Sequence, residues 1–409
     1  MRILVGTVEI GGIINCFADG FRLLGHQVTS VCLQRNPFYP EHKYDIESHK
    51  DALPPDVISA LITTHDVFFF IWGKRSLLPE NAEFPLLKKL GKRIVSLFCG
   101  SDVRHYSAYG QQYGIHLEDV DESYRGDPLV RPLGNLRRGE CYSDLIISVP
   151  NQSSLAVRPY VHYFIPMKIS RYQFNVPGRE VPVIIHAPSN KSRKGTDIIL
   201  AALERLRFDS VPFELRLLHG VSNRQVLAEL VDADIAIDQL YASGGGLFTR
   251  EAIASGCAVA THNSEEHDSF PRNRPLWNID AQNIYHQLKR LLTDKSLRIR
   301  LACQGRQYVE KYYNHVRVAQ RIIDCLNPAH GQIHYDYYPT FFAQKYHIPT
   351  GEIIPDNLKR MTAEIVQYWG LPEDVDPQDM IARGLMLAEE LDLAKPIPRW
   401  KSAPSSGKQ

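Results

Sequence analysis

Short apolar runs alternate with segments of helical periodicity along residues 1–165. In the segment "GIINCFADGFRLLG" the apolar residues recur at helical spacing and stop at a glycine, whereas "DVFFFIW" is continuously apolar, as in a strand buried on both faces. The strand-like runs of this region are RILVG, HQVTSVCL, DVFFFIW, RIVSLF and DLIISV. Strands that alternate with helices predict a parallel, doubly wound sheet.

The alternation stops in a proline-containing connector after residue 149 and then restarts. The second series of strand-like and helix-like runs is VIIHA, GTDIILAALERLR, FELRLL, SNRQVLAELVDA and DIAIDQL. Three further helices are expected near residues 281–293, 296–312 and 316–326. The pattern therefore predicts an α/β protein of two similar domains in tandem, residues 1–165 and 180–326.

Residues 327–409 have a different character and are expected to form a C-terminal extension. The stretch "HYDYYPTFFAQKYH" is dense in aromatic residues, and "NLKRMTAEIVQYWG" and "PQDMIARGLMLAEELD" have the pattern of amphipathic helices. The end, "KPIPRWKSAPSSGKQ", is predicted to be a disordered tail. We expect the aromatic residues to pack on the two-domain core; the alternative is a surface for a partner or an acceptor.

Composition excludes several classes of protein. The net charge of +1 over 409 residues does not favour nucleic acid as a partner, and seven scattered cysteines without a Cys-x-x-Cys pair favour neither a disulfide framework nor a zinc site. The first residues lack the pattern of a signal peptide, and no run of about 18 apolar residues occurs. We expect a cytoplasmic protein, and the composition is compatible with peripheral membrane contact.

Three loops that follow predicted strands are candidates for ligand binding, because ligands bind at the carboxyl ends of strands in open parallel sheets. The first loop, "GTVEIGGIIN", brings Gly11 and Gly12 to a helix start, where backbone N–H groups favour an anion. Its spacing does not match the Gly-x-Gly-x-x-Gly fingerprint, so a nicotinamide cofactor is not supported. The alternative is a tight strand-to-helix turn without a ligand.

The second loop, "HAPSNKSRKGTD", combines several cations with the start of a helix. Asn190, Arg193 and Lys194 lie just before this helix. Fixed positive charge and the helix dipole both favour a diphosphate. The alternative is an ordinary solvated basic loop.

The third loop belongs to "YASGGGLFTREAIASG", in which three glycines precede a helix. The amides of Gly244, Gly245 and Gly246 are placed to face an anion or a hydroxyl group, and Glu251 follows about one turn later. A carboxylate there suits the two hydroxyls of a ribose. The alternative is a glutamate that complements the helix dipole.

Metal-dependent and hydrolase motifs have little support. Asp-x-Asp occurs in "EDVDE", "VDADI" and "EDVDP", and this repetition shows how weak the pattern is. Asp232 and Asp234 are expected to bracket the start of a strand. No His-x-x-x-His pair falls on a predicted helix, and no Gly-x-Ser-x-Gly elbow occurs. We therefore predict neither a metal site nor a cofactor.

Taken in order, these features resemble the retaining glycosyltransferases of the GT-B fold, especially the family-4 group, over residues 1 to 326. The stretch "GGGLFTREAIASGCAVA" is the most specific match, and "HAPSNKSRKGTDIILAALERL" resembles the family's diphosphate loop. The resemblance implies two tandem Rossmann-like domains that face each other across a cleft. It implies a donor nucleotide-diphosphate sugar, of UDP or GDP type, bound by the second domain. It implies an acceptor, a glycan, a lipid-linked group or a small molecule, bound by the first, and a final helix that crosses back onto the first domain.

The resemblance also implies roles for residues on the donor side. Lys194, with Arg193, would neutralise the diphosphate, and Glu251 would bind the ribose. His219 would begin the loop that contacts the base. The remaining donor-side candidates are Gly11, Gly12, Asn190, Ser243, Gly244, Gly245 and Gly246.

Two positions depart from the family pattern. Ser243 stands where the first acid of the Glu-x7-Glu motif is expected, and Cys99, in the acceptor loop "FCGSDVR", stands where the family often has histidine. Asp102, as a catalytic candidate, and Arg104 are the polar residues left for acceptor contact.

The leading hypothesis is a metal-independent, retaining glycosyltransferase in which an oxygen of the donor phosphate takes the acceptor's proton. A catalytically silent module that binds a glycan or a nucleotide on the same scaffold is the alternative. A nucleotide-sugar epimerase would need acids or histidines in the cleft, and no clear set is present.

Overall fold

A computed structural model gives the positions of most of the chain. The residues that it describes are 1–48, 52–71, 73, 75–100, 102–103, 130–149, 155–263, 273–327, 329, 333–336, 353–371 and 376–388. All statements below concern these residues.

The first half of the chain forms a seven-stranded sheet in the order β3-β2-β1-β4-β5-β6-β7. Every neighbouring pair of strands in it is parallel. The strands are β1 (Arg2–Val8), β2 (Gln27–Gln34), β3 (Ile46–Glu47), β4 (Val67–Ile71), β5 (Arg93–Leu97), β6 (Leu145–Ser148) and β7 (Val161–His162). The helices between them are α1 (Ile13–Leu23), α2 (Pro55–Thr64), α3 (Phe84–Lys89) and α6 (Val130–Tyr142).

Residues of β4 explain why this strand is central. All five of its residues are buried, and they face both layers of covering helices. Phe69 packs against Phe17 of α1, with ring centroids 4.6 Å apart, whereas Phe70 packs against Phe84 of α3 at 5.4 Å. The continuous apolar run thus occupies the middle of a sheet covered on both sides, as predicted.

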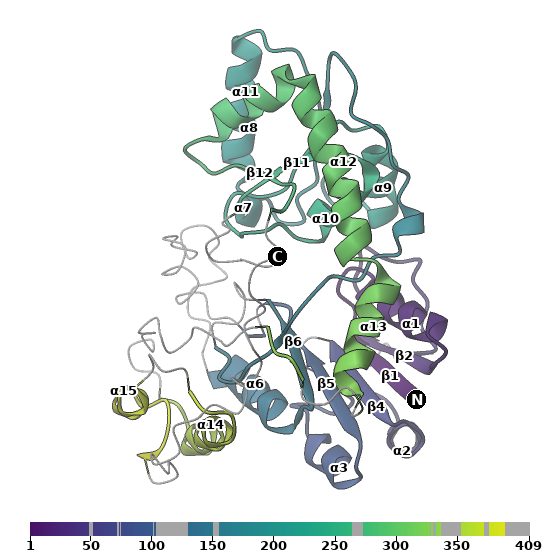
Figure 1. Ribbon diagram of the computed structural model, residues 1–409, viewed down its shortest axis with the longest axis vertical. Coiled ribbons are helices and arrows are strands. Elements are labelled where there is room, and N and C mark those ends of the chain that lie inside the picture. The colour runs from purple at the N-terminus through teal and green to yellow at the C-terminus, as the bar shows by residue number, and fades with distance from the viewer. Residues whose placement is uncertain are drawn as a thin grey trace.

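The second half forms a five-stranded parallel sheet in the order β12-β11-β10-β8-β9. Its strands are β8 (Val183–His186), β9 (Glu214–Leu217), β10 (Ile235–Ile237), β11 (Ala258–Thr261) and β12 (Trp277–Asn278). Its helices are α7 (Lys191–Lys194), α8 (Thr196–Phe208), α9 (Asn223–Leu230), α10 (Leu247–Ser255), α11 (Ile284–Thr293) and α12 (Lys295–Tyr312). A 3-10 turn, η3 (Ile169–Arg171), lies in the connector between the sheets. Figure 1 shows the two halves one above the other.

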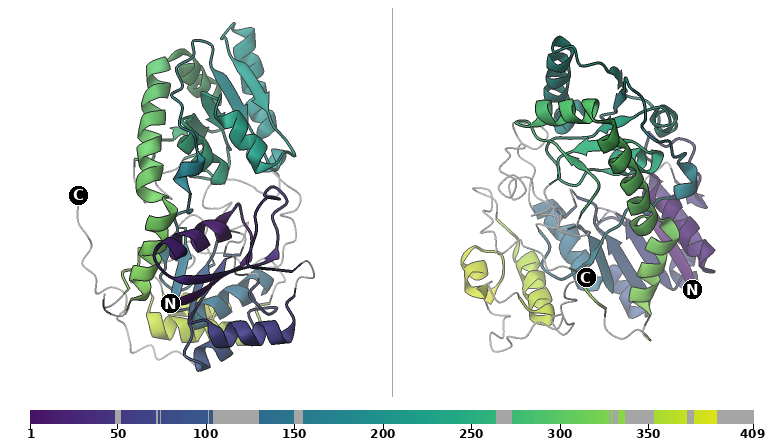
Figure 2. Two further views of the ribbon diagram at one scale, coloured as in Figure 1. Left: turned by 90° about the vertical axis from the view of Figure 1, so that its right-hand side faces the viewer. Right: turned by 45° about the horizontal axis from the view of Figure 1, so that its top comes forward.

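The last helix of the second series, α13 (His315–Leu326), returns to the first sheet and packs against α1. Gly20 of α1 makes this contact close, because a Cβ there would lie 2.7 Å from the His315 carbonyl oxygen. The Asp19 carboxylate accepts hydrogen bonds from His315 Nε2 at 3.0 Å and from Lys168 Nζ at 2.9 Å. The expected crossing of the final helix is confirmed, and both views in Figure 2 place α13 beside the first sheet.

The C-terminal extension contains α14 (Asp356–Trp369) and α15 (Pro377–Ala382), and α14 packs on α6. The buried Arg137 side chain of α6 donates from Nε to Thr362 Oγ1 at 2.8 Å. Apolar residues of the extension, among them Leu358 and Val366, share one buried cluster with Phe98 and Leu136. This part of the extension therefore packs on the first sheet's side of the protein.

The second extension helix is shorter than predicted. Gly384, with φ of 67°, follows α15, and its N–H donates to Ile381 O while the Leu385 N–H donates to Met380 O. A left-handed glycine with these bonds terminates a helix. Most of the aromatic stretch and the predicted tail lie outside the described residues.

The two parallel sheets confirm the predicted fold class, and they fall within residues 1–165 and 180–326. The domain boundaries stay predictions, because α13 belongs to the second range by sequence and to the first sheet by packing. Among the described helices, none is both long enough and apolar enough to cross a membrane.

Candidate functional site

A cavity of about 320 Å³ lies where loops from both sheets meet. Its lining residues follow β1, β2, β8 and β9 or belong to the helices after β8, β9 and β10. They are Ile10, Gly11, Asn36, Phe38, Tyr39, Ala187, Pro188, Ser189, Lys194, Leu218, Gly220, Val221, Asn223, Val226, Leu247, Phe248 and Glu251. The cavity thus opens at the carboxyl ends of parallel strands, the edge at which such sheets bind ligands.

Lys194 supplies the positive charge of this cavity. Its Nζ donates to Asp238 Oδ1 at 2.7 Å and to Gln239 Oε1 at 2.9 Å. Asp238 and Gln239 follow β10 directly, so a strand end of the second sheet holds the basic loop that precedes α8. The ammonium group is therefore fixed in direction as well as in position.

Asp238 is buried and ionised. Burial alone would raise its pKa, but the Lys194 charge, the Gly246 N–H and the Thr249 hydroxyl together bring the pKa below its ordinary value. The Oδ2 atom accepts from Gly246 N at 3.0 Å and from Thr249 Oγ1 at 2.6 Å. One carboxylate thus connects the basic loop to the glycine turn.

The glycine turn before α10 uses part of its hydrogen-bonding capacity internally. The Gly244 N–H donates to His262 O at 3.0 Å, and the Gly246 N–H donates to Asp238. Gly245 has φ of 69°, and a Cβ there would lie 2.2 Å from Thr249 Oγ1, so only glycine fits. Ser243 is buried at the start of the turn. The amides of Gly244 and Gly246 are therefore bonded within the protein, and none of the three glycines is among the cavity's lining residues.

Glu251 lies on the buried face of α10 and lines the cavity. Burial raises the pKa of its carboxyl to about 7, although a hydrogen bond from Asn223 and the charge of Arg171 act in the opposite direction. Asn223 Nδ2 donates to Glu251 Oε1 at 2.8 Å. The site thus holds a carboxylate that is oriented by an amide and is easily protonated.

The two halves of the protein touch at this cavity. The Asn223 N–H, at the first turn of α9, donates to Phe38 O of the first half at 2.9 Å. Leu247 of α10 packs against Gly11, because a Cβ on that glycine would lie 2.3 Å from Leu247 Cδ2. Tyr39 is buried beside them. Burial raises the pKa of its hydroxyl, and the nearby negative charge of Glu251 raises it further.

The start of α1 is occupied by a side chain of the protein. Burial raises the pKa of Glu9, and backbone N–H groups of Gly12, Ile13 and Ile14 counteract this together with the Tyr44 hydroxyl, which donates to Glu9 Oε2 at 2.9 Å. The amides that the sequence offers to an anion therefore face the Glu9 carboxylate. Gly12 is not among the cavity's lining residues, whereas Gly11 is.

Three further candidates lie outside the cavity lining. Asn190 caps α7 by accepting from Arg193 N at 2.9 Å, and both side chains are exposed. His219 Nδ1 donates to Pro188 O at 3.0 Å, while its neighbours Gly220 and Val221 line the cavity. The loop after β9 thus contributes backbone and an apolar side chain rather than the histidine itself.

The predicted acceptor loop is only partly described. Asp102 is 1% exposed, and its carboxylate accepts from the N–H groups of Gly73, Cys99 and Gly100 at 2.8 to 3.2 Å. Asp102 therefore shapes the loop, and a direct role in catalysis stays a prediction. Cys99 is half-buried after β5, and Arg104 lies outside the described residues.

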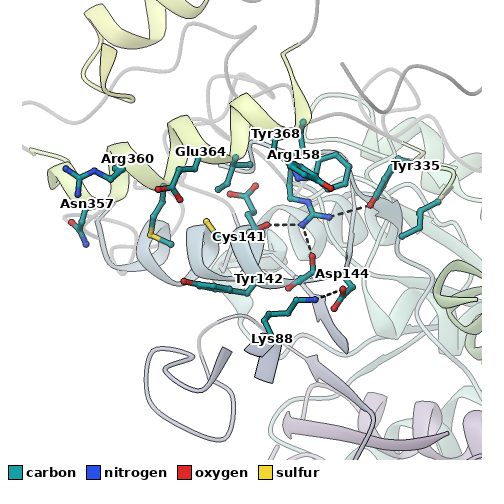
Figure 3. A pocket seen from close by; sticks show the side chains of 16 residues that line it. Lys88, Cys141, Tyr142, Asp144, Arg158, Tyr335, Asn357, Arg360, Glu364 and Tyr368 are labelled. Atoms are coloured by element: carbon teal, nitrogen blue, oxygen red, sulfur yellow. Dashed lines mark hydrogen bonds and ion pairs between the residues drawn. The ribbon is translucent and has the colours of Figure 1, made fainter. Parts of the chain in front are cut away.

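A second, larger cavity of about 860 Å³ lies between α14 and the start of β6. Figure 3 shows Arg360, Glu364 and Tyr368 of α14 on one wall, with Tyr142 and Lys88 opposite. At one end, the Arg158 guanidinium donates to Glu140 O and Ser143 O at 2.8 Å and stacks on the Trp369 ring at 4.3 Å. This cavity is remote from the carboxyl ends of the strands.

Asp238, Gln239 and Asn223 are site residues that sequence reasoning missed. Asp238 and Gln239 could have been found from the sequence, because they form a polar pair directly after the apolar residues of the strand in "DIAIDQL". Asp234, before the same strand, accepts from Val183 N at 2.9 Å and from Arg179 Nη1 at 3.1 Å, so it brackets the strand as expected. No group of three potential metal-ligating side chains was found in the described part of the chain.

Comparison with known proteins identifies the fold. No family model and no curated protein matches the chain. An alpha-glucosyltransferase in complex with UDP and a 13-mer DNA is similar in structure, with a TM-score of 0.54 at 14% identity over 79% of this chain and 98% of its own. Sucrose-phosphate synthase from Thermosynechococcus elongatus has a TM-score of 0.54 at 14% identity over 79% and 97%. The chain has the GT-B fold, with two Rossmann-like halves that meet at the cavity described above.

Proposed function

We propose that this protein is a glycosyltransferase that moves a sugar from a nucleotide-diphosphate sugar to an acceptor hydroxyl. The observation that carries the proposal is the cavity at the strand ends of both halves, which combines the Lys194 ammonium with the Glu251 carboxylate. An ammonium suits a diphosphate, and a carboxylate accepts hydrogen bonds from vicinal hydroxyls. The two groups thus match the two polar ends of a nucleoside diphosphate.

The cavity offers a place for each part of the donor. Lys194 and Ser189 would contact the diphosphate, Glu251 the ribose, and the apolar wall of Pro188, Leu218 and Val221 the base. Because a related structure of the same fold was solved with UDP, UDP is the first nucleotide to test, with GDP as the second.

In the proposed reaction, the acceptor oxygen attacks the anomeric carbon on the face from which the diphosphate leaves. A donor phosphate oxygen takes the proton, and the configuration is retained. Lys194 would stabilise the charge that develops on the leaving diphosphate, which is the role that a divalent ion would otherwise fill. Ser243, at the position of the expected acid, is buried and carries a hydroxyl but no charge.

The acceptor side of the proposal is broader. A glycan, a lipid-linked group or a small molecule would be bound by the first half, in a cytoplasmic setting. The net charge of +1 does not favour nucleic acid, although the similar alpha-glucosyltransferase was solved with DNA. The absence of nucleic acid among the partners stays a prediction.

A catalytically silent binding module is the second candidate. It is favoured by Ser243, which cannot stabilise positive charge, and by Asp102, whose oxygens are used by backbone N–H groups. A silent module that binds the nucleotide differs from the transferase only in turnover. Release of nucleotide diphosphate from a panel of UDP- and GDP-sugars, with and without EDTA, separates them.

Replacement of Lys194 by alanine tests the site assignment. We expect the affinity for UDP, or for GDP if UDP does not bind, to fall at least about tenfold, because a charge-assisted bond to phosphate is lost. Isothermal titration calorimetry measures this loss. Lys191→Ala removes a cation from the same short helix, at an exposed position outside the cavity lining, and is the matched control. Equal affinities of wild type and Lys194→Ala would reject the assignment.

A further inference from the structure

The Lys194 ammonium is held by two acceptors that follow one strand. An ammonium group has three N–H donors. Two of them are directed at Asp238 Oδ1 and Gln239 Oε1, at 2.7 and 2.9 Å. Gln239 is itself oriented, because its Nε2 donates to Ala242 O at 3.0 Å.

The remaining N–H of Lys194 belongs on the cavity side. The side chain is 18% exposed, against 2% for that of Asp238, and Lys194 lines the cavity while Asp238 does not. The two acceptors lie behind the ammonium, towards the strand. A ligand oxygen in the cavity would thus accept a hydrogen bond from a Lys194 N–H that Asp238 and Gln239 have already oriented.

We infer that Asp238 is the positioning residue that aims the Lys194 ammonium at the diphosphate of the donor. The inference rests on the proposed function and goes beyond it, since it assigns a role to a residue that would not touch the substrate. Without Asp238, the long lysine side chain would regain its rotamers, and binding a diphosphate would have to restrict them again.

The same carboxylate also places the glycine turn. Asp238 Oδ2 accepts from Gly246 N and Thr249 Oγ1, at 3.0 and 2.6 Å. Gly246 lies close to both charges, because a Cβ there would be 4.0 Å from Lys194 Nζ and from Asp238 Oδ2. A side chain at this position would stand over the ammonium. Asp238 therefore fixes the position of the turn beside the cation that it orients.

One ratio separates a role of Asp238 in positioning Lys194 from a purely structural role: the affinity for UDP divided by the affinity for uridine, which lacks the diphosphate. If UDP does not bind, GDP and guanosine replace this pair. Lys194→Ala should lower the ratio at least about tenfold. We expect Asp238→Ala to lower it by a similar factor, and the double variant to lower it no further than Lys194→Ala alone.

Asp234→Ala is the matched control. Asp234 is a buried carboxylate before the same strand, and it contacts Arg179 and Val183 rather than the cavity. Its loss should weaken folding but leave the ratio unchanged. Asp238→Asn keeps an oxygen for Lys194 and should restore part of the ratio lost in Asp238→Ala; it replaces alanine in the cycle if that variant does not fold.

The outcomes distinguish the inference from the proposed function. If Asp238→Ala weakens UDP and uridine binding equally, or if the double variant shows the sum of both losses, Asp238 does not position Lys194 and the inference is wrong. In that case the proposed function stands. If the wild-type protein binds neither UDP nor GDP, the proposed function and the inference fall together.

Discussion

At the scale of single residues, the environment decides what each carboxyl group does. Glu251 is buried in the cavity wall with one hydrogen bond from Asn223, and its pKa is raised to about 7. Asp238 is equally buried, yet the Lys194 charge keeps its pKa low. The two acids lie near the same helix, and only one of them changes its charge near neutral pH.

The Glu251 pKa predicts a specific dependence of stability on pH. Because the folded-state pKa lies above the ordinary value of 4.5, ionisation of Glu251 costs the folded state free energy. This cost is absent below about pH 4.5, grows as the pH rises to about 7, and is then constant at about 3 kcal/mol. Glu251→Gln removes it while keeping an oxygen for Asn223.

We therefore expect the free energy of unfolding of wild type to fall relative to that of Glu251→Gln between about pH 4.5 and pH 7. Urea denaturation of both proteins at several pH values measures the difference, in which other titrating groups cancel. Parallel curves over this range would mean that Glu251 has an ordinary pKa.

At the scale of elements, the contact of α1 with α13 depends on one small residue. Gly20 is an interior helical position, and a Cβ there would lie 2.7 Å from the His315 carbonyl oxygen and 3.0 Å from Ala319 Cβ. A backbone carbonyl cannot move aside as the end of a side chain can. The close approach of α13 to α1 therefore depends on the absence of a side chain at Gly20.

Gly20→Ala should destabilise the protein by about 1 to 3 kcal/mol, because overpacking outweighs the gain of about 1 kcal/mol in helix propensity. Gly134 of α6 is the matched control: its nearest neighbours would lie 3.9 Å from an added Cβ. Gly134→Ala should be neutral or stabilising by up to about 1 kcal/mol. Urea denaturation compares the two; equal effects would show that the helix contact is loose.

At the scale of the whole molecule, the extension completes the core of the first half. Ile354, Leu358 and Val366 share a buried cluster with Phe98 and Leu133. Removing the extension would expose these residues together, and large exposed apolar patches promote aggregation. The described part of the extension is thus a structural component of the protein.

A chain that ends at residue 327 should therefore melt at a lower temperature and aggregate more readily than the full chain. A chain that ends at residue 388 keeps α14 and α15 and is the control; it should melt like the full chain. Differential scanning fluorimetry and light scattering measure both effects. If the shorter chain melts at the full-length temperature, the cluster contributes little to stability.

Local signals predicted most of the architecture. Runs such as "DVFFFIW" became fully buried strands, and the helices expected near residues 296–312 and 316–326 correspond to α12 and α13. Helix ends were harder to predict: α15 stops before Gly384, because a left-handed glycine and its hydrogen bonds outweigh the amphipathic pattern beyond it.

Part of the candidate site was predictable for a similar reason. Lys194, Glu251 and Gly11 follow strands, and the carboxyl ends of parallel strands meet at one edge, so these residues were expected to lie together and do line one cavity. The partners Asp238 and Asn223 were not found, because each lies 28 or more residues from the group that it contacts.

The sequence by itself determined the class of fold and the loops that reach the cavity, because periodicity and glycine or basic loops at strand ends are local properties. Tertiary structure alone decided which polar groups remain available there. The Glu9 carboxylate faces the backbone amides at the start of α1, and the Asp102 carboxylate accepts hydrogen bonds from N–H groups of its own loop. Asp238 orients the Lys194 ammonium. Burial and long-range hydrogen bonds set the charge and direction of a carboxyl group, and neither is encoded in its neighbours along the chain.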